Sequence, residues 1–571
     1  MPSPDACRIC RGSLTLFKPG GGDDLLSTSL VPTCHRPAAH GDLHRCRECG
    51  TVQQPSLPRG RELHALYGDM SDTAYLAEEA GRRRTARRLL DLVEGEHDGG
   101  RLLEVGCGHG LLLDEARTRG YEVRGIELSA AAVAHARDKL GLRVDEVALE
   151  AAELADERFD VIVLADVIEH LDDPLAALDR CCELLRPEGS LVVVTPDPAS
   201  LTARLAGGRW WGYLPGHCCL FPRCTLRELI AARGLVLAHD VPLVRSFTAA
   251  YWLGGLIERG GWAGGALRAL AGRRGGTRML SLSLGDERVV VARKAQVAQP
   301  AAPIAVDRGR RPKVHVVLPA YQAASTVAHV AATLPRDSSD RALLVDDASR
   351  DATAEAALAA GLEVLRHPVN RGYGANQKTC YTRAALDGAD IVVMVHADNQ
   401  YDPSLAAEMV KPIEAGIADV VIGSRLLHDR AIEGGMPRWK WVGNRALTIA
   451  ENVGFRRRFS EYHTGYRAFS VDFLRSIAFL RNSDGFVFDQ EIFAQAVAAG
   501  ARVIELPIPT RYFLEASSVS FTRSVEYGLK TLGVLVRFRV DERRRRWLML
   551  RRPADTLRAS DSAQRDASLV G

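Results

Sequence analysis

Short apolar runs alternate with helix-length segments twice along this chain, over residues 102–196 and again over residues 314–425. The first stretch contains LLEV, EVRGIEL, FDVIVLADV and SLVVVTP, and the second contains VHVVLPAYQ, RALLVDDAS, LEVLRHP, IVVMVHADN and DVVIGSR. This alternation is typical of βαβ units, in which helices cover both faces of a parallel sheet. The sequence therefore predicts an α/β protein with two doubly wound sheets.

The segment between the two stretches predicts a domain boundary. Residues 296–312 are rich in Ala, Pro and basic residues and lack apolar periodicity, which is typical of a linker. We expect an N-terminal module over 1–55, an α/β domain over 56–295, a second one over 313–535, and a basic, partly disordered tail over 536–571. The formal net charge of +3 arises from nearly balanced acidic and basic residues, so it indicates no nucleic-acid partner.

Four cysteines in two CxxC pairs predict a metal site in the N-terminal module. The pairs are Cys7 with Cys10 and Cys46 with Cys49. Zn²⁺ takes four soft ligands in a tetrahedron, and each CxxC turn supplies two thiolates, so two turns close a structural zinc site. The spacer between the pairs is longer than usual, and it contains Cys34, His35 and His44, which could replace a ligand. The alternative is that these are reduced cysteines in a surface loop.

A glycine-rich turn follows the first strand expected in the first α/β domain. It reads Gly106-Cys107-Gly108-His109-Gly110, and glycine lets a backbone turn sharply and approach a ligand closely. A dinucleotide site would ask for glycine at position 111, where this chain has Leu111. Glu127 closes the second strand and can accept hydrogen bonds from both ribose hydroxyls of an adenosine. The pattern thus favours an adenosine-containing ligand over NAD.

With these motifs and LADVIEHLDDP at 164–174, residues 75–235 resemble class I S-adenosylmethionine-dependent methyltransferases. The CxxC pairs ahead of them resemble those of the zinc-knuckle methyltransferases of sugar and natural-product pathways. The resemblance implies that S-adenosylmethionine is the cofactor. It implies cofactor contacts for Glu104, Gly106, Gly108, Gly110, Glu127, Asp166 and Val167.

Two histidines are candidates for a catalytic base in the methyltransferase. Transfer to an acceptor that carries a proton needs a base as well as alignment of the nucleophile with the sulfonium carbon. His170 follows the fourth strand, and His217 lies in WWGYLPGHCCLF. The alternative for each is a structural histidine next to a helix start.

The second α/β domain, residues 313–535, resembles the inverting family 2 glycosyltransferases of the GT-A fold. The resemblance is strongest to polyprenyl-phosphate sugar synthases such as dolichyl-phosphate mannose synthases. It implies a nucleotide-sugar donor and a sugar, lipid-phosphate or metabolite acceptor. The residues that it assigns to donor binding lie at strand ends and in NRGYGANQ, namely Pro319, Tyr321, Asp346, Asp347, Asn370, Gly372, Gly374 and Lys378.

The family's metal-binding DxD motif is altered in this chain. It reads His396-Ala397-Asp398, followed by Asn399-Gln400, so one carboxylate is missing. Mg²⁺ prefers oxygen ligands, whereas imidazole suits Mn²⁺ better. We expect Asp398 to be the main ligand of Mg²⁺ or Mn²⁺, with Gln400 adding an oxygen and His396 as a possible third ligand. Arginines that could support the diphosphate are Arg425, Arg467 and Arg511.

The segment GFVFDQEIF at 485–493 resembles the family's acidic helix, in which Asp489 and Glu491 are candidates for a general base. A sugar hydroxyl needs such a base, whereas a phosphate acceptor is already ionised. We take Asp489 as catalytic, and an exposed helix charge is the alternative for Glu491.

The C-terminal region combines the apolar stretch YGLKTLGVLVRFRV with DERRRRWLMLRR. A basic segment with an aromatic residue can lie on an anionic membrane surface, and the alternative is a solvated helix end. No run of about 18 apolar residues and no signal peptide is present, so we expect a cytoplasmic protein. The basic segment leaves open a peripheral position at the inner face of the membrane.

Together the motifs predict a bifunctional methyltransferase and glycosyltransferase of polysaccharide, glycolipid or natural-product biosynthesis. The alternative is that one domain has lost catalysis and serves as a ligand-binding or scaffold module, and His396 keeps this alternative open for the second domain.

Overall fold

The computed structural model describes residues 6–21, 40–70, 75–94, 99–154, 157–252, 278–294, 297–298, 311–427, 436–509, 521–541, 547–551 and 553. The chain divides into two compact units, Met1–Lys294 and Ala295–Gly571. Arg511, Cys34, His35 and the Arg543–Arg546 run lie outside the described residues. No helix among the described residues is long and apolar enough to cross a membrane.

The first unit is built on a seven-stranded sheet in the order β10-β13-β8-β7-β4-β5-β6. Its strands are β4 (Gly100–Val105), β5 (Tyr121–Glu127), β6 (Val144–Glu146), β7 (Phe159–Ala165), β8 (Leu185–Pro196), β10 (Leu235–Pro242) and β13 (Glu287–Lys294). Strands β8, β7, β4, β5 and β6 run parallel to one another. Strand β13 is antiparallel to both of its neighbours, β8 and β10. The expected parallel sheet is therefore confirmed, with an antiparallel pair added at one edge.

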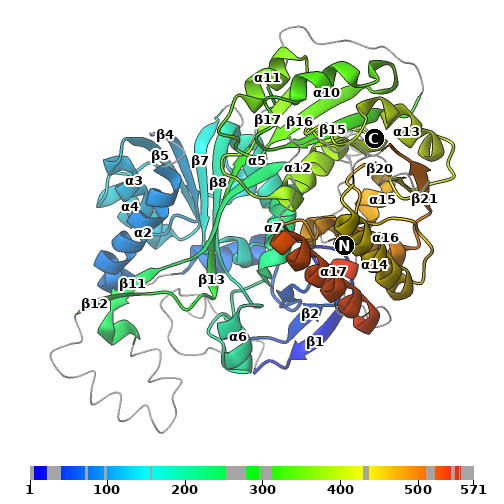
Figure 1. Ribbon diagram of the computed structural model, residues 1–571. Coiled ribbons are helices and arrows are strands. Elements are labelled where there is room, and N and C mark those ends of the chain that lie inside the picture. The colour runs from blue at the N-terminus through cyan, green and yellow to red at the C-terminus, as the bar shows by residue number, and fades with distance from the viewer. Residues whose placement is uncertain are drawn as a thin grey trace, which may run out of the picture. The chain divides into compact units, whose positions relative to one another are not determined.

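Helices of the first unit are α1 (Arg61–Gly68), α2 (Glu79–Glu94), α3 (Leu111–Thr118), α4 (Ala130–Asp138), α5 (Pro174–Leu184), α6 (Leu201–Ala206) and α7 (Arg223–Ala232) (Figure 1). Of these, α2, α3 and α4 share an apolar core with the seven-stranded sheet. In α2 the buried residues Ala86, Leu89, Leu90 and Val93 recur three and four positions apart, as expected for one helix face. A two-stranded antiparallel sheet of β11 (Arg245–Thr248) and β12 (Met279–Leu282) packs beside α2.

The N-terminal module forms a small antiparallel sheet in the order β1-β2-β3-β9. Its strands are β1 (Leu14–Lys18), β2 (Leu43–Cys46), β3 (Val52–Gln53) and β9 (Cys219–Leu220). The fourth strand thus comes from a segment about 170 residues downstream, and Gln54 Nε2 donates to the carbonyls of Leu214 and His217 in the same segment. The module is consequently part of the first compact unit.

The second unit is built on an eight-stranded sheet in the order β14-β17-β16-β15-β18-β20-β19-β21. Its strands are β14 (Val297–Ala298), β15 (Val314–Ala320), β16 (Arg341–Asp346), β17 (Glu363–Arg366), β18 (Ile391–Met394), β19 (Val420–Ser424), β20 (Arg467–Ser470) and β21 (Val503–Pro507). Strands β15 to β18 are parallel, and β20 is antiparallel to both β18 and β19. Val297 and Ala298, which lie within the expected linker, form β14 at the sheet edge.

Helices of the second unit are α10 (Val327–Thr333), α11 (Thr353–Ala359), α12 (Tyr373–Leu386), α13 (Ala406–Glu414), α14 (Arg438–Phe455), α15 (Val471–Ser476), α16 (Phe488–Ala499) and α17 (Phe521–Asp541). A core of Val, Leu, Ile and Ala side chains joins α10, α11 and α13 to strands β15, β18 and β20. The α/β class with two sheets, predicted from the alternation, is confirmed. Figure 1 labels many of the elements of both units.

Candidate functional sites

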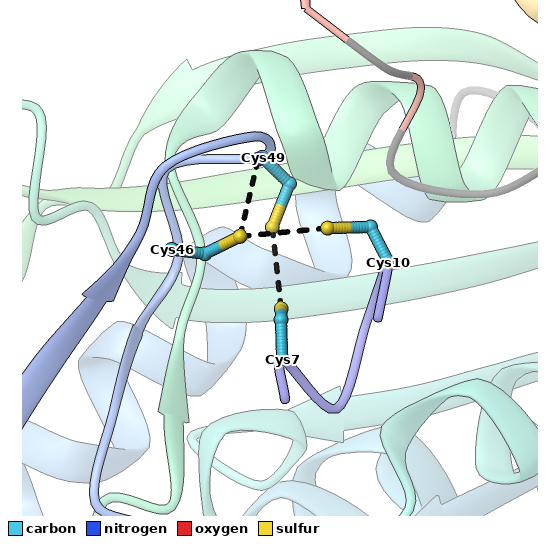
Figure 2. Close-up of side chains that lie close together, drawn as sticks. All are labelled: Cys7, Cys10, Cys46 and Cys49. Atoms are coloured by element: carbon cyan, nitrogen blue, oxygen red, sulfur yellow. Dashed lines mark hydrogen bonds between the residues drawn. The ribbon is translucent and has the colours of Figure 1, made fainter. Parts of the chain in front are cut away.

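The four cysteines of the two CxxC pairs point toward one another, as Figure 2 shows. Their sulfur atoms all lie within 4.8 Å of one another, with 3.6 Å between Cys7 and Cys49 and 3.4 Å between Cys10 and Cys46. A tetrahedral zinc site with Zn–S bonds of about 2.3 Å separates its sulfurs by about 3.8 Å. The cluster therefore has the donor set and nearly the spacing of a structural zinc site.

Hydrogen bonds from the protein reach these sulfur atoms from outside the cluster. Gln53 Nε2 donates to Cys7 Sγ at 2.8 Å, and the main-chain N–H groups of Ile9 and Glu48 donate to Cys7 and Cys46. Hydrogen bonds from the other three cysteines lower the pKa of the Cys7 thiol, and the bond from Cys10 has the largest effect. Such donors stabilise thiolate charge and orient the ligands. His44 is half-buried on β2, and its Nδ1 lies 3.4 Å from the carbonyl of Asp42.

A cavity of about 820 Å³ opens in the first unit at the carboxyl ends of β4, β5 and β7. Ligands of open α/β sheets bind at this edge because the strand-to-helix turns diverge there. Every residue to which we assigned a cofactor contact lines this cavity, except Gly110.

The glycine turn between β4 and α3 has three left-handed residues, with φ of 68° at Gly106, 51° at Gly108 and 79° at Gly110. A Cβ at Gly106 would lie 2.5 Å from Val167, and one at Gly110 would lie 2.6 Å from Leu142. A Cβ at Gly108 would meet only the Tyr75 hydroxyl, at 4.0 Å. Gly106 and Gly110 are therefore needed for packing, whereas Gly108 faces the open cavity.

Glu127 and Glu104 bring two carboxylates to the cavity wall. Glu127 accepts main-chain hydrogen bonds from Gly108 at 2.8 Å and from Leu128 and Ser129. Glu104 is buried, and its Oε2 has no hydrogen-bond partner among the described residues. Burial, followed by the nearby Glu127 charge, raises the pKa of Glu104. A ligand with positive charge or hydroxyl donors would satisfy both groups.

Asp166 and Val167 occupy the turn after β7. Asp166 has a left-handed φ of 56°, which short polar residues tolerate better than most. Its Oδ2 accepts a hydrogen bond from Arg245 at 2.6 Å, while its buried Oδ1 has no partner among the described residues. Arg245 also pairs with Glu287, so the arginine joins the cavity wall to β13. The sequence motifs did not indicate Arg245.

His170 and His217 lie side by side in the cavity wall, with ring centroids 4.7 Å apart. His170 Nδ1 donates to the Gly216 carbonyl at 3.0 Å and lies 2.7 Å from the Tyr67 hydroxyl oxygen. His217 Nδ1 donates to the Gly212 carbonyl at 2.7 Å. Because both Nδ1 atoms face carbonyls, both Nε2 atoms carry lone pairs.

Burial lowers the pKa of His170 to about 4. Burial, followed by the neighbouring His170, also lowers the pKa of His217 well below its ordinary value. Both imidazoles are thus neutral at pH 7. A Glu169 oxygen and a nitrogen of each ring lie within 4.8 Å of one another, so this trio could also hold a metal ion. The pair that we predicted from separate motifs is brought together by the fold.

The aromatic residues near His217 divide between core and cavity. Trp210 and Tyr213 pack with Leu43, Val52 and Leu220 in the N-terminal module, whereas Trp211 lines the cavity. Both indole N–H groups donate to Asp286 Oδ2, at 2.8 and 2.6 Å.

In the second unit the paired acids at the end of β16 are buried. Asp347 accepts hydrogen bonds from the main-chain N–H groups of Arg371 and Gly372 and lies 2.6 Å from His367 Nδ1. Asp346 Oδ2 has no hydrogen-bond partner among the described residues and lies 3.2 Å from Arg366 Nε. Asp347 therefore anchors the NRGYG loop. Pro319 ends β15 with Ala320, and the next residue, Tyr321, is exposed.

The NRGYGANQ segment packs against residues 482–485. A Cβ at Gly372 would lie 2.8 Å from the Asp484 carbonyl oxygen, and one at Gly374 would lie 2.4 Å from the Ser483 carbonyl oxygen. Lys378 Nζ contacts the Asn482 carbonyl and Asp484 Oδ1. These contacts explain the residue types structurally, and nucleotide contacts of Asn370, Gly372, Gly374 and Lys378 stay a prediction.

His396 is held between aromatic residues. Its Nε2 lies 3.3 Å from the Tyr373 hydroxyl, its ring packs edge-on against Tyr401, and a Cβ at Gly465 would lie 2.1 Å from that nitrogen. Asp398 is half-buried, and its Oδ1 accepts from the main-chain N–H of Gln400 at 3.1 Å. The described His, Cys, Asp and Glu residues form no group of three ligand atoms at Asp398. A divalent cation here would need oxygens from a bound diphosphate.

Asp489 is the centre of a buried hydrogen-bond network. Its Oδ2 accepts from the Tyr373 hydroxyl at 3.0 Å, and its Oδ1 accepts from Gln377 Nε2 at 3.1 Å. Tyr373 therefore links Asp489 to His396, a connection that the sequence motifs did not indicate. Glu491, by contrast, accepts from the main-chain N–H and the hydroxyl of Ser483, so it holds the 482–485 loop.

The two predicted arginines within the described residues both have protein partners. Arg425 pairs with the buried Glu461, and its main-chain N–H donates to the same carboxylate at 2.8 Å. Arg467 is buried and donates to the carbonyls of Thr464, Tyr462 and Asp489. Roles of Arg425, Arg467 and Arg511 at a diphosphate stay predictions.

Family models match both units. The methyltransferase domain model matches residues 77–240, and the glycosyl transferase family 2 model matches residues 315–478. The chain joins a methyltransferase domain to a family 2 glycosyltransferase domain. The segment matched by the methyltransferase model includes the glycine turn that lines the 820 Å³ cavity. The segment matched by the glycosyl transferase model includes the Asp398 motif.

Relatives match parts of this chain. An uncharacterized protein of Methanocaldococcus jannaschii is 29% identical over 231 residues, which is 40% of this chain and 94% of that protein. A ubiquinone biosynthesis O-methyltransferase of Cereibacter sphaeroides is 38% identical over 120 residues, 20% of this chain. The chain thus spans 49% of the length of that methyltransferase. Among solved structures, glucosyl-3-phosphoglycerate synthase from Mycobacterium tuberculosis matches 43% of this chain and 88% of its own, at 17% identity and a TM-score of 0.34.

Proposed function

We propose that the chain is bifunctional, with methyl transfer from S-adenosylmethionine in the first unit and inverting transfer from a nucleotide sugar in the second. The observation that carries the first half is the cavity at the ends of β4, β5 and β7, with open space over Gly108 and carboxylates at Glu104 and Glu127. This donor set fits S-adenosylmethionine, whose ribose supplies hydroxyl donors and whose sulfonium and amino groups are cationic. When bound, the cofactor supplies an electrophilic methyl group.

His170 and His217 are the proposed bases for an acceptor that must lose a proton. Both imidazoles are neutral at pH 7 and have free Nε2 lone pairs at the cavity wall. Gly216 and Gly212 carbonyls fix the ring orientations, and Tyr67 adds a second contact to His170. A proton taken from the acceptor would therefore reside on Nε2 of one ring.

Calorimetry with S-adenosylmethionine tests this half on the full chain. We expect Glu127→Ala to weaken binding by about ten- to a hundredfold, because a carboxylate hydrogen bond to the ligand is lost. Glu122→Ala, an exposed residue on the same strand, is the matched control. No binding by the parent chain, or equal binding by the Glu127 variant, would contradict the cofactor assignment.

For the second unit we propose donor binding at Pro319, Tyr321, Asp346, Asp347, Asn370, Gly372, Gly374 and Lys378, and Mg²⁺ or Mn²⁺ at Asp398 with Gln400 and His396. When bound, the cation neutralises charge on the departing nucleotide diphosphate. Asp489 is the proposed base for an acceptor hydroxyl, held in place by Tyr373 and Gln377. The acceptor is a sugar, a lipid phosphate or a metabolite. The setting is polysaccharide, glycolipid or natural-product biosynthesis.

Hydrolysis and transfer with a panel of nucleotide sugars, each with Mg²⁺ or Mn²⁺, tests this half. We expect one donor to turn over with metal and Asp398→Ala to reduce the rate at least a hundredfold, roughly the effect of removing a charge-stabilising group. An Asp398→Ala variant as fast as the parent would exclude the proposed metal site. Turnover that requires added lipid phosphate would identify that acceptor class.

The second candidate is a ligand-binding or scaffold role for the second unit, favoured by His396 in place of a carboxylate and by the protein partners of Arg425 and Arg467. Nucleotide-sugar binding without turnover under both metals is the result that would support it.

A further inference from the structure

Two helices of the second unit present apolar side chains to solvent. On α14 they are Trp439, Val442, Ile449 and Val453, and on α17 they are Val525, Leu529, Leu532, Val536 and Val540. Successive positions on α17 are four, three, four and four residues apart, so they form one stripe along the helix. Exposed fractions reach 64% at Ile449, 73% at Val453, 65% at Val536 and 76% at Val540.

The two helices pack against each other through their other sides. A Cβ at Gly454 would lie 2.8 Å from Leu535, and one at Gly528 would lie 3.7 Å from Leu447. These pairs advance together along both helices, so α14 and α17 run parallel. We call the exposed apolar residues of both helices the α14/α17 face. Large contiguous apolar surfaces of this kind mark interaction sites.

Basic residues lie at both ends of the α14/α17 face. Arg438 and Lys440 begin α14, and Arg456, Arg457 and Arg458, all exposed, follow its last turn. The described acids of the two helices do not offset them, because Glu451 and Asp541 are buried and Glu526 is paired with Lys530 at 2.6 Å.

This charge pattern distinguishes between two occupants. A second copy docked face to face about a two-fold axis in the antiparallel sense would place the arginines that follow α14 against Arg438 and Lys440, which is unfavourable. An anionic phospholipid surface takes both features, because apolar side chains enter the boundary of headgroups and acyl chains while flanking cations meet the headgroups.

We propose that the α14/α17 face docks the protein on an anionic membrane surface. The proposal uses described residues of α14 and α17 and does not depend on either transfer reaction. The inner side of α14 carries Asn444, whose side-chain amide donates to Glu461 at 2.9 Å beside Arg425. Docking would therefore bring the Arg425–Glu461 pair of the glycosyltransferase domain close to the membrane.

Flotation of the full chain with phosphatidylcholine vesicles, with and without phosphatidylglycerol, tests the proposal. We expect binding only with phosphatidylglycerol. A double variant, Ile449→Gln and Val536→Gln, should bind about tenfold or more weakly, because two apolar contacts are lost. Arg457→Gln with Arg458→Gln should weaken binding about fivefold per arginine. Ile417→Gln, 58% exposed after α13, is the matched control and should bind as the parent does.

The proposal would be overturned if the parent chain bound neither kind of vesicle. It would also be overturned if Ile417→Gln lost as much vesicle binding as the Ile449 and Val536 double variant. Size-exclusion chromatography with light scattering addresses self-association. A dimer that the Ile449 and Val536 double variant converts to monomer, with no vesicle binding by the parent, would assign the face to a second copy instead. If the apolar double variant fails to fold, the arginine variants still test the electrostatic contribution to membrane binding.

Discussion

At the scale of single residues, side chains predicted from separate motifs acquire partners that no motif names. His170 and His217 come from segments 47 positions apart in the chain and meet across one cavity wall. Asp489 and His396 are connected by Tyr373, which lies within a segment that we assigned to nucleotide binding. Spacing along the chain carries no signal for such contacts, because each depends on the final side-chain directions.

The lowered pKa of His170 predicts a pH-dependent stability. The folded chain keeps this imidazole neutral down to about pH 4, whereas in the unfolded chain it binds a proton near its ordinary value of 6.5. Between these values the unfolded state binds more protons, so stability falls as pH drops. Between pH 7 and pH 5 the free energy of unfolding of His170→Gln should therefore fall by about 1–2 kcal/mol less than that of the parent chain.

Denaturant unfolding at the two pH values measures this effect. His135→Gln, at a half-buried position of the same unit, is the control and should leave the pH dependence unchanged. An identical pH dependence in the parent and in His170→Gln would contradict the prediction.

Tyr373→Phe removes the hydroxyl that donates to Asp489 and leaves the stacked ring against Phe486. We expect kcat for glycosyl transfer to a hydroxyl acceptor to fall about ten- to a hundredfold, while KM for the donor changes little, because positioning of the base is lost. Steady-state kinetics of the parent chain and of Tyr373→Phe checks this. A selective rise in KM for the donor would instead show that Tyr373 binds the nucleotide sugar.

At the scale of elements, one loop and one distant strand hold motif-bearing segments in place. The N-terminus of α12 is held by the Asp484 carbonyl, which accepts hydrogen bonds from the Gly374 and Ala375 main-chain N–H groups. Strand β9 completes the N-terminal sheet, although its two residues have no strand signal of their own. Such elements form because a neighbouring edge supplies hydrogen bonds, so local periodicity does not indicate them.

Gly374→Ala should destabilise the chain by about 2–4 kcal/mol, because its Cβ would lie 2.4 Å from the Ser483 carbonyl oxygen and the loop must shift. Gly443→Ala is the matched control in α14, where nothing lies within 4 Å of the new Cβ. There we expect a gain of up to about 1 kcal/mol from helix propensity. Equal unfolding midpoints of the two variants would contradict the packing role.

Removal of one cysteine of the Cys7/Cys10/Cys46/Cys49 cluster should affect the first unit beyond the N-terminal module. Thr225 Oγ1 donates to the Cys49 carbonyl, and β3 pairs with β9, so the cysteine cluster is tied to the methyltransferase domain. We expect Cys49→Ser to lower both bound zinc and the melting temperature of this unit, since structural zinc contributes folding free energy. Cys182→Ser, away from the cluster, should change neither.

At the scale of the whole molecule, the chain consists of two compact units, Met1–Lys294 and Ala295–Gly571, each with its own sheet. Because each unit has its own core, ligands of one should stabilise that unit alone. In scanning calorimetry of the full chain, S-adenosylmethionine at about a hundred times Kd should stabilise one transition by about 2.7 kcal/mol. A nucleotide sugar with metal should raise the other transition, and a shift of both by one ligand would contradict independence.

The sequence by itself determined the α/β class, the division into a methyltransferase and a family 2 glycosyltransferase domain, and the CxxC pairs, because strand periodicity and strand-end motifs are local in the chain. Only the tertiary structure brought β9 to the N-terminal sheet, paired His170 with His217, and joined Tyr373 to Asp489. The tertiary structure also leaves the α14/α17 face exposed, although apolar residues three and four positions apart on a helix would predict a buried stripe. The physical reason is that burial and partners depend on which surfaces pack together, and this is a property of the whole fold.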